Sequence, residues 1–200
     1  MSIMNHEGLR HFFLGKRRFQ LAWIFAFLLA VFANHYPSII GILICFFGAT
    51  LRFISSGYLR KESKLAVGGP YAHTRNPLYL GTFIMALGAT ISVGAHLLAF
   101  IMGVVFFLNY HYVIQFEETK LPKLFGESYQ NYCQLVPRFL PRLMAPSKTD
   151  LLKINPDPAV YGFSFSLAMK NKAFEAYASF FGLILGVTAL VYFKKMFRLS

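Results

Sequence analysis

Residues 76–116, NPLYLGTFIMALGATISVGAHLLAFIMGVVFFLNYHYVIQF, decide the fold because they contain no Asp, Glu, Lys or Arg. A polar break at 92–96 divides this stretch into two apolar arms. A helix that crosses a bilayer needs roughly 17–25 apolar residues, and its backbone must form its hydrogen bonds within the segment. The stretch therefore predicts a hairpin of two membrane-spanning helices whose outer ends return to the same membrane surface.

Two more charge-free stretches surround this hairpin. Residues 19–51 are broken by Asn34-His35-Tyr36-Pro37-Ser38 and predict another hairpin, and residues 176–193 predict a final helix. The chain is therefore predicted to be an all-α integral membrane protein of one domain, 1–200, with about five transmembrane helices.

The composition supports a membrane protein and excludes several other classes. The chain is 56% hydrophobic and 14% charged, whereas soluble domains have about 25% charged residues. These values exclude a disordered chain, a secreted disulfide scaffold and an ordinary cytosolic domain. The net charge of +12 is more typical of contact with anionic membrane lipids than of nucleic-acid binding.

The distribution of basic residues predicts the orientation in the membrane. They gather in the N-terminal arm and in the segments after the second and fourth spans: Arg10, Lys16, Arg17, Arg18, Arg60, Lys61, Lys64, Arg75, Lys120, Lys123, Arg138, Arg142, Lys148, Lys153, Lys170 and Lys172. The turns at 34–38 and 92–96 have none, so the basic segments are predicted to be cytoplasmic. Lys194, Lys195 and Arg198 do not fit this scheme, because five spans place them outside.

Charged residues stand at both ends of the 76–116 hairpin. Arg75 precedes it and Glu117-Glu118 follows it, although the chain has only eight acidic residues. Both ends reach the same surface, so these side chains are predicted to form a site at the boundary between water and lipid. Gly68-Gly69-Pro70 before Arg75 is predicted to let the backbone approach a ligand. The alternative is that Arg75 extends to lipid phosphates and the two carboxylates merely end a helix in water.

Other segments near these ends have weaker signals. His111 lies on the helical face of Glu118 and is either a proton carrier or a histidine satisfied within the helix. No set of His, Cys and carboxylates has metal-ligand spacing, so no metal is predicted. Residues 118–135 predict an amphipathic helix at the membrane surface, and the proline-containing segment from Pro137 to Pro158 predicts an extended linker.

Several ordered motifs resemble the isoprenylcysteine carboxyl methyltransferase family, which in turn resembles the membrane phospholipid methyltransferases. They are Gly69-Pro70-Tyr71, Arg75-Asn76-Pro77-Leu78-Tyr79-Leu80-Gly81, Glu117-Glu118, Phe125-Gly126-Glu127-Ser128-Tyr129 and Val136-Pro137-Arg138-Phe139-Leu140-Pro141. The resemblance covers about residues 51–141. The first span and the C-terminal part, a linker and final helix over 142–200, match only in layout.

The resemblance implies a multi-pass membrane enzyme that binds S-adenosylmethionine on the cytoplasmic side. It implies that Arg75, Glu117 and Glu118 serve the transfer. The cofactor-binding residues that we infer with it are Tyr71, Arg75, Asn76, Pro77, Tyr79, His111, Glu117, Glu118, Arg138 and Phe139. Glu118 is favoured over Glu117 because its helical face also has His111. At Asn76 this chain departs from the family, in which His is more usual, and Asn cannot titrate.

The predicted function is methyl transfer from S-adenosylmethionine to a lipophilic small molecule or prenylated acceptor. Carboxyl O-methylation of an isoprenylcysteine is the nearest analogy. The alternatives are an NADPH-dependent membrane reductase and a non-catalytic small transporter or scaffold. Membrane lipids are the other predicted partners, and no nucleic acid is expected. The sequence leaves the acceptor, the oligomeric state and the particular cellular membrane open.

Overall fold

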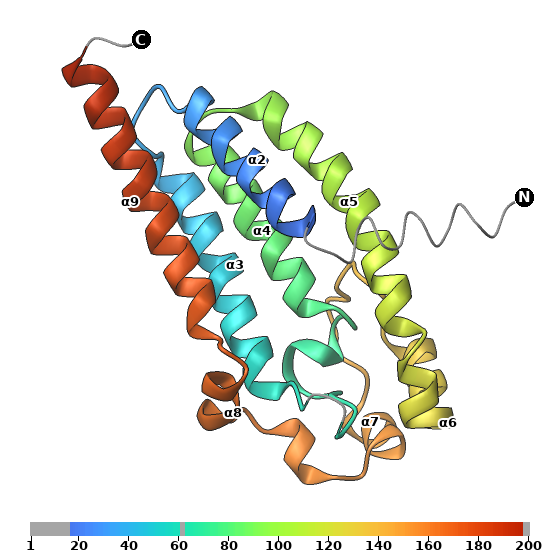
Figure 1. Cartoon of the computed structure of the whole chain (residues 1–200). Coiled ribbons are helices and arrows are strands. Elements are labelled where there is room, and N and C mark those ends of the chain that lie inside the picture. The colour runs from blue at the N-terminus through green and yellow to red at the C-terminus, as the bar shows by residue number, and fades with distance from the viewer. Residues whose placement is uncertain (1–16, 61–62, 198–200) are drawn as a thin grey trace, which may run out of the picture.

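The computed structural model describes residues 17–60 and 63–197, apart from the side chains of 17–23 and 109–112. Within these ranges the chain is helical and has no strand, which confirms the predicted all-α class. The five predicted apolar helices are present as α2 (Arg17–Phe32), α3 (Ile39–Tyr58), α4 (Pro77–Ser92), α5 (His96–Glu118) and α9 (Phe174–Met196). They run alternately in opposite directions along one bundle (Figure 1).

Three of these helices are long and apolar enough to cross a membrane: α3, α5 and α9. The apolar helix α4 has 16 residues. Helix α2 is described from Arg17 onwards, where the described residues begin. Sixteen residues rise only about 24 Å, less than the roughly 30 Å of a hydrocarbon core. The chain is thus an integral membrane protein in which one predicted span, α4, is shorter than a full crossing.

Helices α3 and α4 are in close contact through glycines. A Cβ atom added at Gly88 would lie 2.4 Å from the backbone nitrogen of Cys45, and one added at Gly48 would lie 2.6 Å from that of Met85. Inside lipid, helices associate by such close packing of small residues, since lipid tails are as apolar as the side chains. This contact holds α3 and α4 against each other.

The basic end of α9 lies beside the turn that follows α2. The Lys194 ammonium donates to the carbonyl of Ala30 at 3.0 Å and to that of Ala33 at 3.2 Å. Lys195 lies 4.4 Å from the ring centroid of Tyr36. Lys194 therefore satisfies the C-terminal carbonyls of α2, and Lys195 faces an aromatic ring. Both basic residues, which do not fit the predicted orientation, thus have a structural role.

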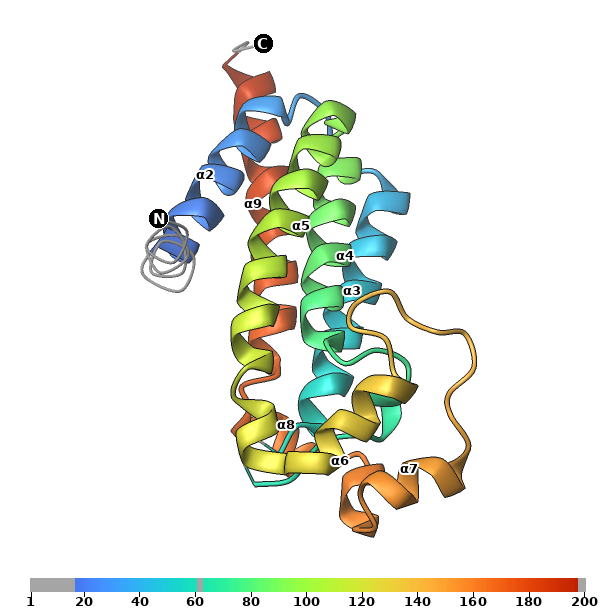
Figure 2. The same ribbon diagram turned by 90° about the vertical axis from the view of Figure 1, so that its right-hand side faces the viewer.

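At the opposite end, which we call the foot, the chain forms several short helices (Figure 2). The foot is where α3 and α5 end and α4 begins. Its elements are η1 (Gly69–Ala72), α6 (Leu121–Leu135), α7 (Lys148–Ile154), η2 (Pro158–Tyr161) and α8 (Phe165–Lys170). Helix α6 confirms the predicted amphipathic helix, although Gly126 interrupts its helical backbone.

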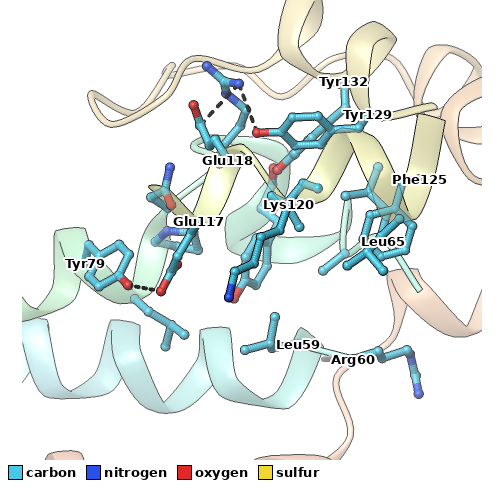
Figure 3. A pocket seen from close by; sticks show the side chains of 18 of the residues that line it. Leu59, Arg60, Leu65, Tyr79, Glu117, Glu118, Lys120, Phe125, Tyr129 and Tyr132 are labelled. Carbon is cyan, nitrogen blue, oxygen red and sulfur yellow. Dashed lines mark hydrogen bonds and ion pairs between the residues drawn. The ribbon is translucent and has the colours of Figure 1, made fainter. Parts of the chain in front are cut away.

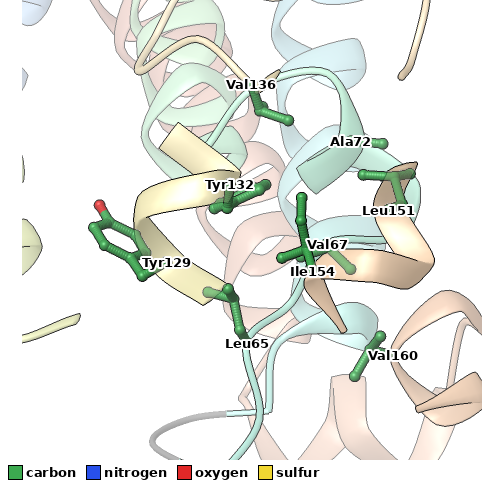
Figure 4. Packing of buried hydrophobic residues seen from close by; sticks show 9 residues of the cluster. All are labelled: Leu65, Val67, Ala72, Tyr129, Tyr132, Val136, Leu151, Ile154 and Val160. Carbon is green, nitrogen blue, oxygen red and sulfur yellow. The ribbon is translucent and has the colours of Figure 1, made fainter. Parts of the chain in front are cut away.

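The predicted extended linker from Pro137 to Pro158 is wrong at α7 and at the start of η2, and the rest of it is not helical. The Ser147 hydroxyl caps α7 by accepting from the Asp150 amide. Leu151 and Ile154 of α7 are buried against residues of α6 and of the segment before η1 (Figure 4). Prolines outside a helix or in its first turn permit short helices, and the tertiary contacts stabilise this one.

Candidate active site

A cavity of about 570 Å³ lies at the foot, enclosed by the ends of α3 and α5, the start of α4, and α6 (Figure 3). Its walls combine charged, aromatic and aliphatic side chains. They come from Arg52, Leu59, Arg60, Lys64, Leu65, Ala66, Tyr71, Arg75, Asn76, Pro77, Leu78, Tyr79, Thr82, Glu117, Glu118, Lys120, Leu121, Leu124, Phe125, Tyr129 and Tyr132.

Most of the predicted site residues meet at this cavity. Those in its wall are Tyr71, Arg75, Asn76, Pro77, Tyr79, Glu117 and Glu118. Arg138 and Phe139 are not part of the wall. His111 lies in α5, and its side chain is outside the described part of the structure. Arg75 and the two glutamates thus come together as the hairpin geometry predicts.

Glu118 lies between two guanidinium groups. One carboxylate oxygen is 3.3 Å from Arg75, the other is 2.8 Å from the Nε of Arg138, and the side chain is 10% exposed. Arg75 also donates to the thiol of Cys133. The Nε of Arg75 and Oε1 of Glu118 are buried and have no hydrogen-bond partner. Oε1 of Glu118 is the oxygen that forms the ion pair with Arg75, so the Nε–H of Arg75 is the buried donor here that still lacks an acceptor; buried polar groups are normally satisfied.

Glu117 has a different environment from its neighbour. Its carboxylate accepts a hydrogen bond of 2.5 Å from the Tyr79 hydroxyl. Among the described residues, no cation lies within 4.0 Å of it. Successive residues on a helix point about 100° apart, which is why one carboxylate meets the guanidinium pair and the other a phenol. The charge of Glu117 is thus available to a cationic ligand.

Tyr71 adds a buried hydrogen-bonding group to the wall. Burial, and then the charge of Glu117, raise the pKa of Tyr71 above its usual range, so its hydroxyl stays protonated. This hydroxyl has no partner in the described structure. The backbone carbonyl of Tyr71 accepts from the buried Tyr132 hydroxyl at 2.6 Å, which fixes η1 against α6. Tyr71 is therefore held rigidly with one polar atom free to bind a ligand.

Residues 73–76 are bound along their length to residues 138–142. The Asn76 amide donates to the carbonyl of Arg138 at 2.9 Å, and the Thr74 hydroxyl donates to that of Phe139 at 2.9 Å. The Phe139 ring lies 6.2 Å from the ring of Phe106 on α5. The Asn76 side chain thus holds the 138–142 segment through its amide, a role that needs no titratable group. Arg138 and Phe139 support the site from behind the wall.

The glycine pair before η1 accommodates the protein itself instead of a ligand. Gly69 has φ +56°, and a Cβ atom there would lie 2.5 Å from the ring of Tyr58. One at Gly68 would lie 2.5 Å from the carbonyl oxygen of Val160. The prediction that these glycines admit a ligand is therefore wrong, since their backbone approaches α3 and η2.

Sequence reasoning missed the walls supplied by α6 and by the end of α3. The α6 residues in the wall are Leu121, Leu124, Phe125, Tyr129 and Tyr132. The resemblance implies that this surface helix encloses the cofactor, but the amphipathic spacing alone does not tell which of its residues line the cavity. Lys64, whose ammonium bonds to Asp157, and Arg60, which donates to the Ala159 carbonyl at 2.5 Å, join the 59–68 loop to η2.

The arrangement suits a molecule with both cationic and anionic groups. Glu117 offers a negative charge, Arg75 offers a donor, and aromatic rings form part of the wall. The volume lies within the roughly 300–1,000 Å³ of small-molecule sites. Within the described residues, no cluster of three metal-ligating side chains is present.

Comparisons with known proteins identify the family. A family model described as phospholipid methyltransferase matches residues 23–128, more than half of the chain. The protein-S-isoprenylcysteine O-methyltransferase of Schizosaccharomyces pombe is 32% identical over 94 residues, which cover 47% of this chain and 40% of that protein. The methanethiol S-methyltransferase of Crocosphaera subtropica is 28% identical over 144 residues, 70% of this chain and 51% of that protein.

The chain spans between 30% and 51% of the length of the methyltransferases that it matches. A second methanethiol S-methyltransferase, from Bradyrhizobium diazoefficiens, is 41% identical over 81 residues, which cover 40% of this chain and 30% of that protein. No solved structure matches the chain. The family match includes the whole 76–116 hairpin and both glutamates, and it confirms the resemblance found in the motifs: the chain belongs to the phospholipid methyltransferase family.

Proposed function

We propose that this protein is a multi-pass membrane methyltransferase that binds S-adenosylmethionine in the foot cavity and methylates a lipophilic acceptor. The observation that carries the proposal is Glu117, a carboxylate in the cavity wall with no cation among its described neighbours. The cavity also presents three buried polar atoms without hydrogen bonds, on Tyr71, Arg75 and Glu118. S-adenosylmethionine has an ammonium, a carboxylate and a sulfonium, which such groups complement.

The sulfonium supplies an already activated methyl group, so the protein contributes mainly orientation and exclusion of water. Glu117, held by Tyr79, binds the ammonium group. Arg75 offers its Nε–H to a carboxylate. Glu118 neutralises Arg75 and Arg138 and keeps both guanidiniums in place. Helix α6 covers the cavity with Leu121, Leu124 and Phe125.

The assignment of the ammonium to Glu117 differs from the sequence-based preference for Glu118. That preference depended on a helical face shared with His111. The two ion pairs of Glu118 support Glu117 as the carboxylate that a cofactor meets first.

The membrane fold, the phospholipid methyltransferase family and the fission yeast relative support a lipophilic acceptor that reaches the cavity from the bilayer. The fission yeast relative is named for S-isoprenylcysteine, and two other relatives are named for methanethiol. A site that serves such acceptors from the membrane needs no water-filled route for them. The clustered basic residues at the foot support a cytoplasmic position for the cavity.

Calorimetry on the detergent-solubilised protein tests the proposal. We expect S-adenosylhomocysteine to bind and NADPH not to bind. Glu117→Gln should weaken S-adenosylhomocysteine binding about ten- to hundred-fold, the effect of losing one charged hydrogen bond. The control Glu127→Gln removes a carboxylate outside the cavity wall and should leave the affinity unchanged. Binding of NADPH alone would favour the reductase, and binding of neither ligand would favour a non-catalytic protein.

A further inference from the structure

Arg52 is a cation inside a membrane helix without a carboxylate beside it. It lies six residues before the end of α3 at Tyr58, roughly 9 Å along the helix axis. Its guanidinium donates to the hydroxyl of Thr82 on α4. Within the described residues, no Asp or Glu lies within 4.0 Å of it. Ionised groups at such depth are nearly always paired, so Arg52 lacks an anion.

Helix α4 leaves space for this side chain at Gly81. A Cβ atom added to Gly81 would lie 2.6 Å from the Cγ of Arg52. The absent side chain lets Arg52 pass along α4 to Thr82. Since a guanidinium has five N–H donors and the described residues engage it once, at Thr82, most of its donors remain for another molecule.

Arg52 lines a second cavity as well as the main one. The second cavity has a volume of about 200 Å³ and shares Arg52, Leu59 and Leu78 with the first. Its other walls come from α3, the turn between α8 and α9, and the first turn of α9: Ser56, Asn171, Lys172, Ala173, Glu175 and Ala176. The cavity thus lies at the foot, between the end of α3 and the start of α9, two helices apolar enough to cross the membrane.

The other polar groups of this second cavity already have partners. The Asn171 amide donates to the carbonyls of Ser56 at 2.9 Å and Leu59 at 2.7 Å. The Lys172 ammonium is 3.9 Å from Glu175. Arg52 is therefore the cation in its described wall that lacks a carboxylate.

We propose that Arg52 binds an oxyanion, a carboxylate or a phosphate, on the methyl acceptor. This inference rests on the proposed methyltransferase function and specifies the acceptor as an anionic amphiphile. A guanidinium holds either group through two parallel hydrogen bonds. A volume of about 200 Å³ accommodates a headgroup and leaves the apolar part of the acceptor to the membrane. Glu117 and Arg52 then bind groups of opposite charge and orient the two substrates relative to each other.

The test measures binding of matched amphiphiles to the full chain in a neutral detergent. Tetradecanoate, tetradecyl phosphate and tetradecanol share one chain length and differ in the headgroup. We expect at least one oxyanion to bind wild-type protein at least tenfold more tightly than the alcohol, and the oxyanion that binds identifies the group on the acceptor. Arg52→Gln should lose this preference, and Arg52→Lys should retain part of it because it keeps the charge without the fork. Lys123→Gln removes one charge outside both cavities and should bind as wild type.

S-adenosylhomocysteine binding, measured on the same samples, separates this inference from the proposed function. If wild-type protein does not bind S-adenosylhomocysteine, the proposed function is contradicted. Unchanged oxyanion binding in Arg52→Gln, or equally tight binding of tetradecanol to wild-type protein, would overturn the role of Arg52. A fall in S-adenosylhomocysteine affinity alone would also overturn it, because Arg52 would then serve the cofactor. If Arg52→Gln does not fold, as judged by circular dichroism, Arg52→Lys decides. A weaker preference of Arg52→Lys for the oxyanion supports the role of Arg52, and an unchanged preference overturns it.

Discussion

At the scale of single residues, Arg75 joins three helices. It stands just before α4, pairs with Glu118 of α5 and donates to Cys133 of α6. One terminal nitrogen of Arg75 makes both contacts, and its Nε–H has no partner. A lysine has the same charge but lacks this additional donor. We therefore expect Arg75→Lys to lower methyl transfer at least tenfold while circular dichroism shows an intact fold, since a charged hydrogen bond contributes about 1.5–3 kcal/mol.

Arg142→Lys is the matched control for this change. Arg142 lies at the foot and donates to the Leu135 carbonyl at 2.6 Å, outside the cavity wall. It should retain most of the activity. Near-normal transfer by Arg75→Lys would support the simpler role of Arg75 as an anchor to lipid phosphates.

The buried hydroxyl of Tyr132 provides a prediction about stability. Its hydrogen bond to the Tyr71 carbonyl is 2.6 Å long, and the residue is 2% exposed. Tyr132→Phe leaves this carbonyl without its donor, which should cost about 1–3 kcal/mol of unfolding free energy. Thermal melting in detergent measures the loss. Tyr192→Phe, at a residue 56% exposed on α9, should melt as wild type, and equal melting of both variants would mean that the bond contributes nothing.

The sequence predicts the site residues next to the apolar stretches and misses those that arrive from elsewhere. Arg75 and Glu117 could be found because each adjoins an end of one hairpin. Tyr129 and Tyr132 show an amphipathic spacing, but a spacing does not tell whether the apolar face meets lipid or protein. Arg52 could not be singled out from the sequence, because its contact with Thr82 joins two different helices.

At the scale of elements, the contact between α3 and α4 depends on glycines. A Cβ atom at Gly88 would lie 2.4 Å from the backbone nitrogen of Cys45, so one helix must move. We expect Gly88→Ala to destabilise the protein by about 1–3 kcal/mol in denaturant titrations, the usual cost of overpacking. Gly103→Ala on α5 has nothing within 4 Å of the new atom and should be neutral or stabilising. A Gly88→Ala variant as stable as Gly103→Ala would show that the contact is loose.

The short helices of the foot show where prediction by element fails. Apolar spans are recognisable because lipid imposes length and composition on each one separately. Helix α7 has seven residues, too few to be stable alone. Its stability comes from the burial of Leu151 and Ile154 against α6 and the residues before η1. Such contacts join segments far apart in the sequence. Local composition shows only the prolines, which predict an extended linker and not a helix.

At the scale of the whole molecule, the two ends of the bundle differ in kind. The foot contains the cavity, the short helices and most of the basic residues. The opposite end has two turns, at 34–38 and 92–96, without Lys or Arg. The end of α9 joins these turns, and its Lys194 is bound to the carbonyls that end α2. Its charge is therefore engaged by the protein and need not oppose an outer location.

This asymmetry predicts the topology, which cysteine labelling of intact cells can check. With Cys133 replaced by Ala, an impermeant maleimide should reach His35→Cys, His96→Cys and Phe197→Cys, all exposed beside the turns or at the end of α9.

Lys123→Cys and Lys153→Cys, exposed at the foot, should react only after the cells are permeabilised. Reaction of the foot positions in intact cells would reverse the orientation and remove cytoplasmic access to the cavity. Protection of Phe197→Cys together with labelling of His35→Cys would mean that α9 does not cross the membrane. In that case Lys194 could not reach the end of α2, and the bundle would have to be rearranged.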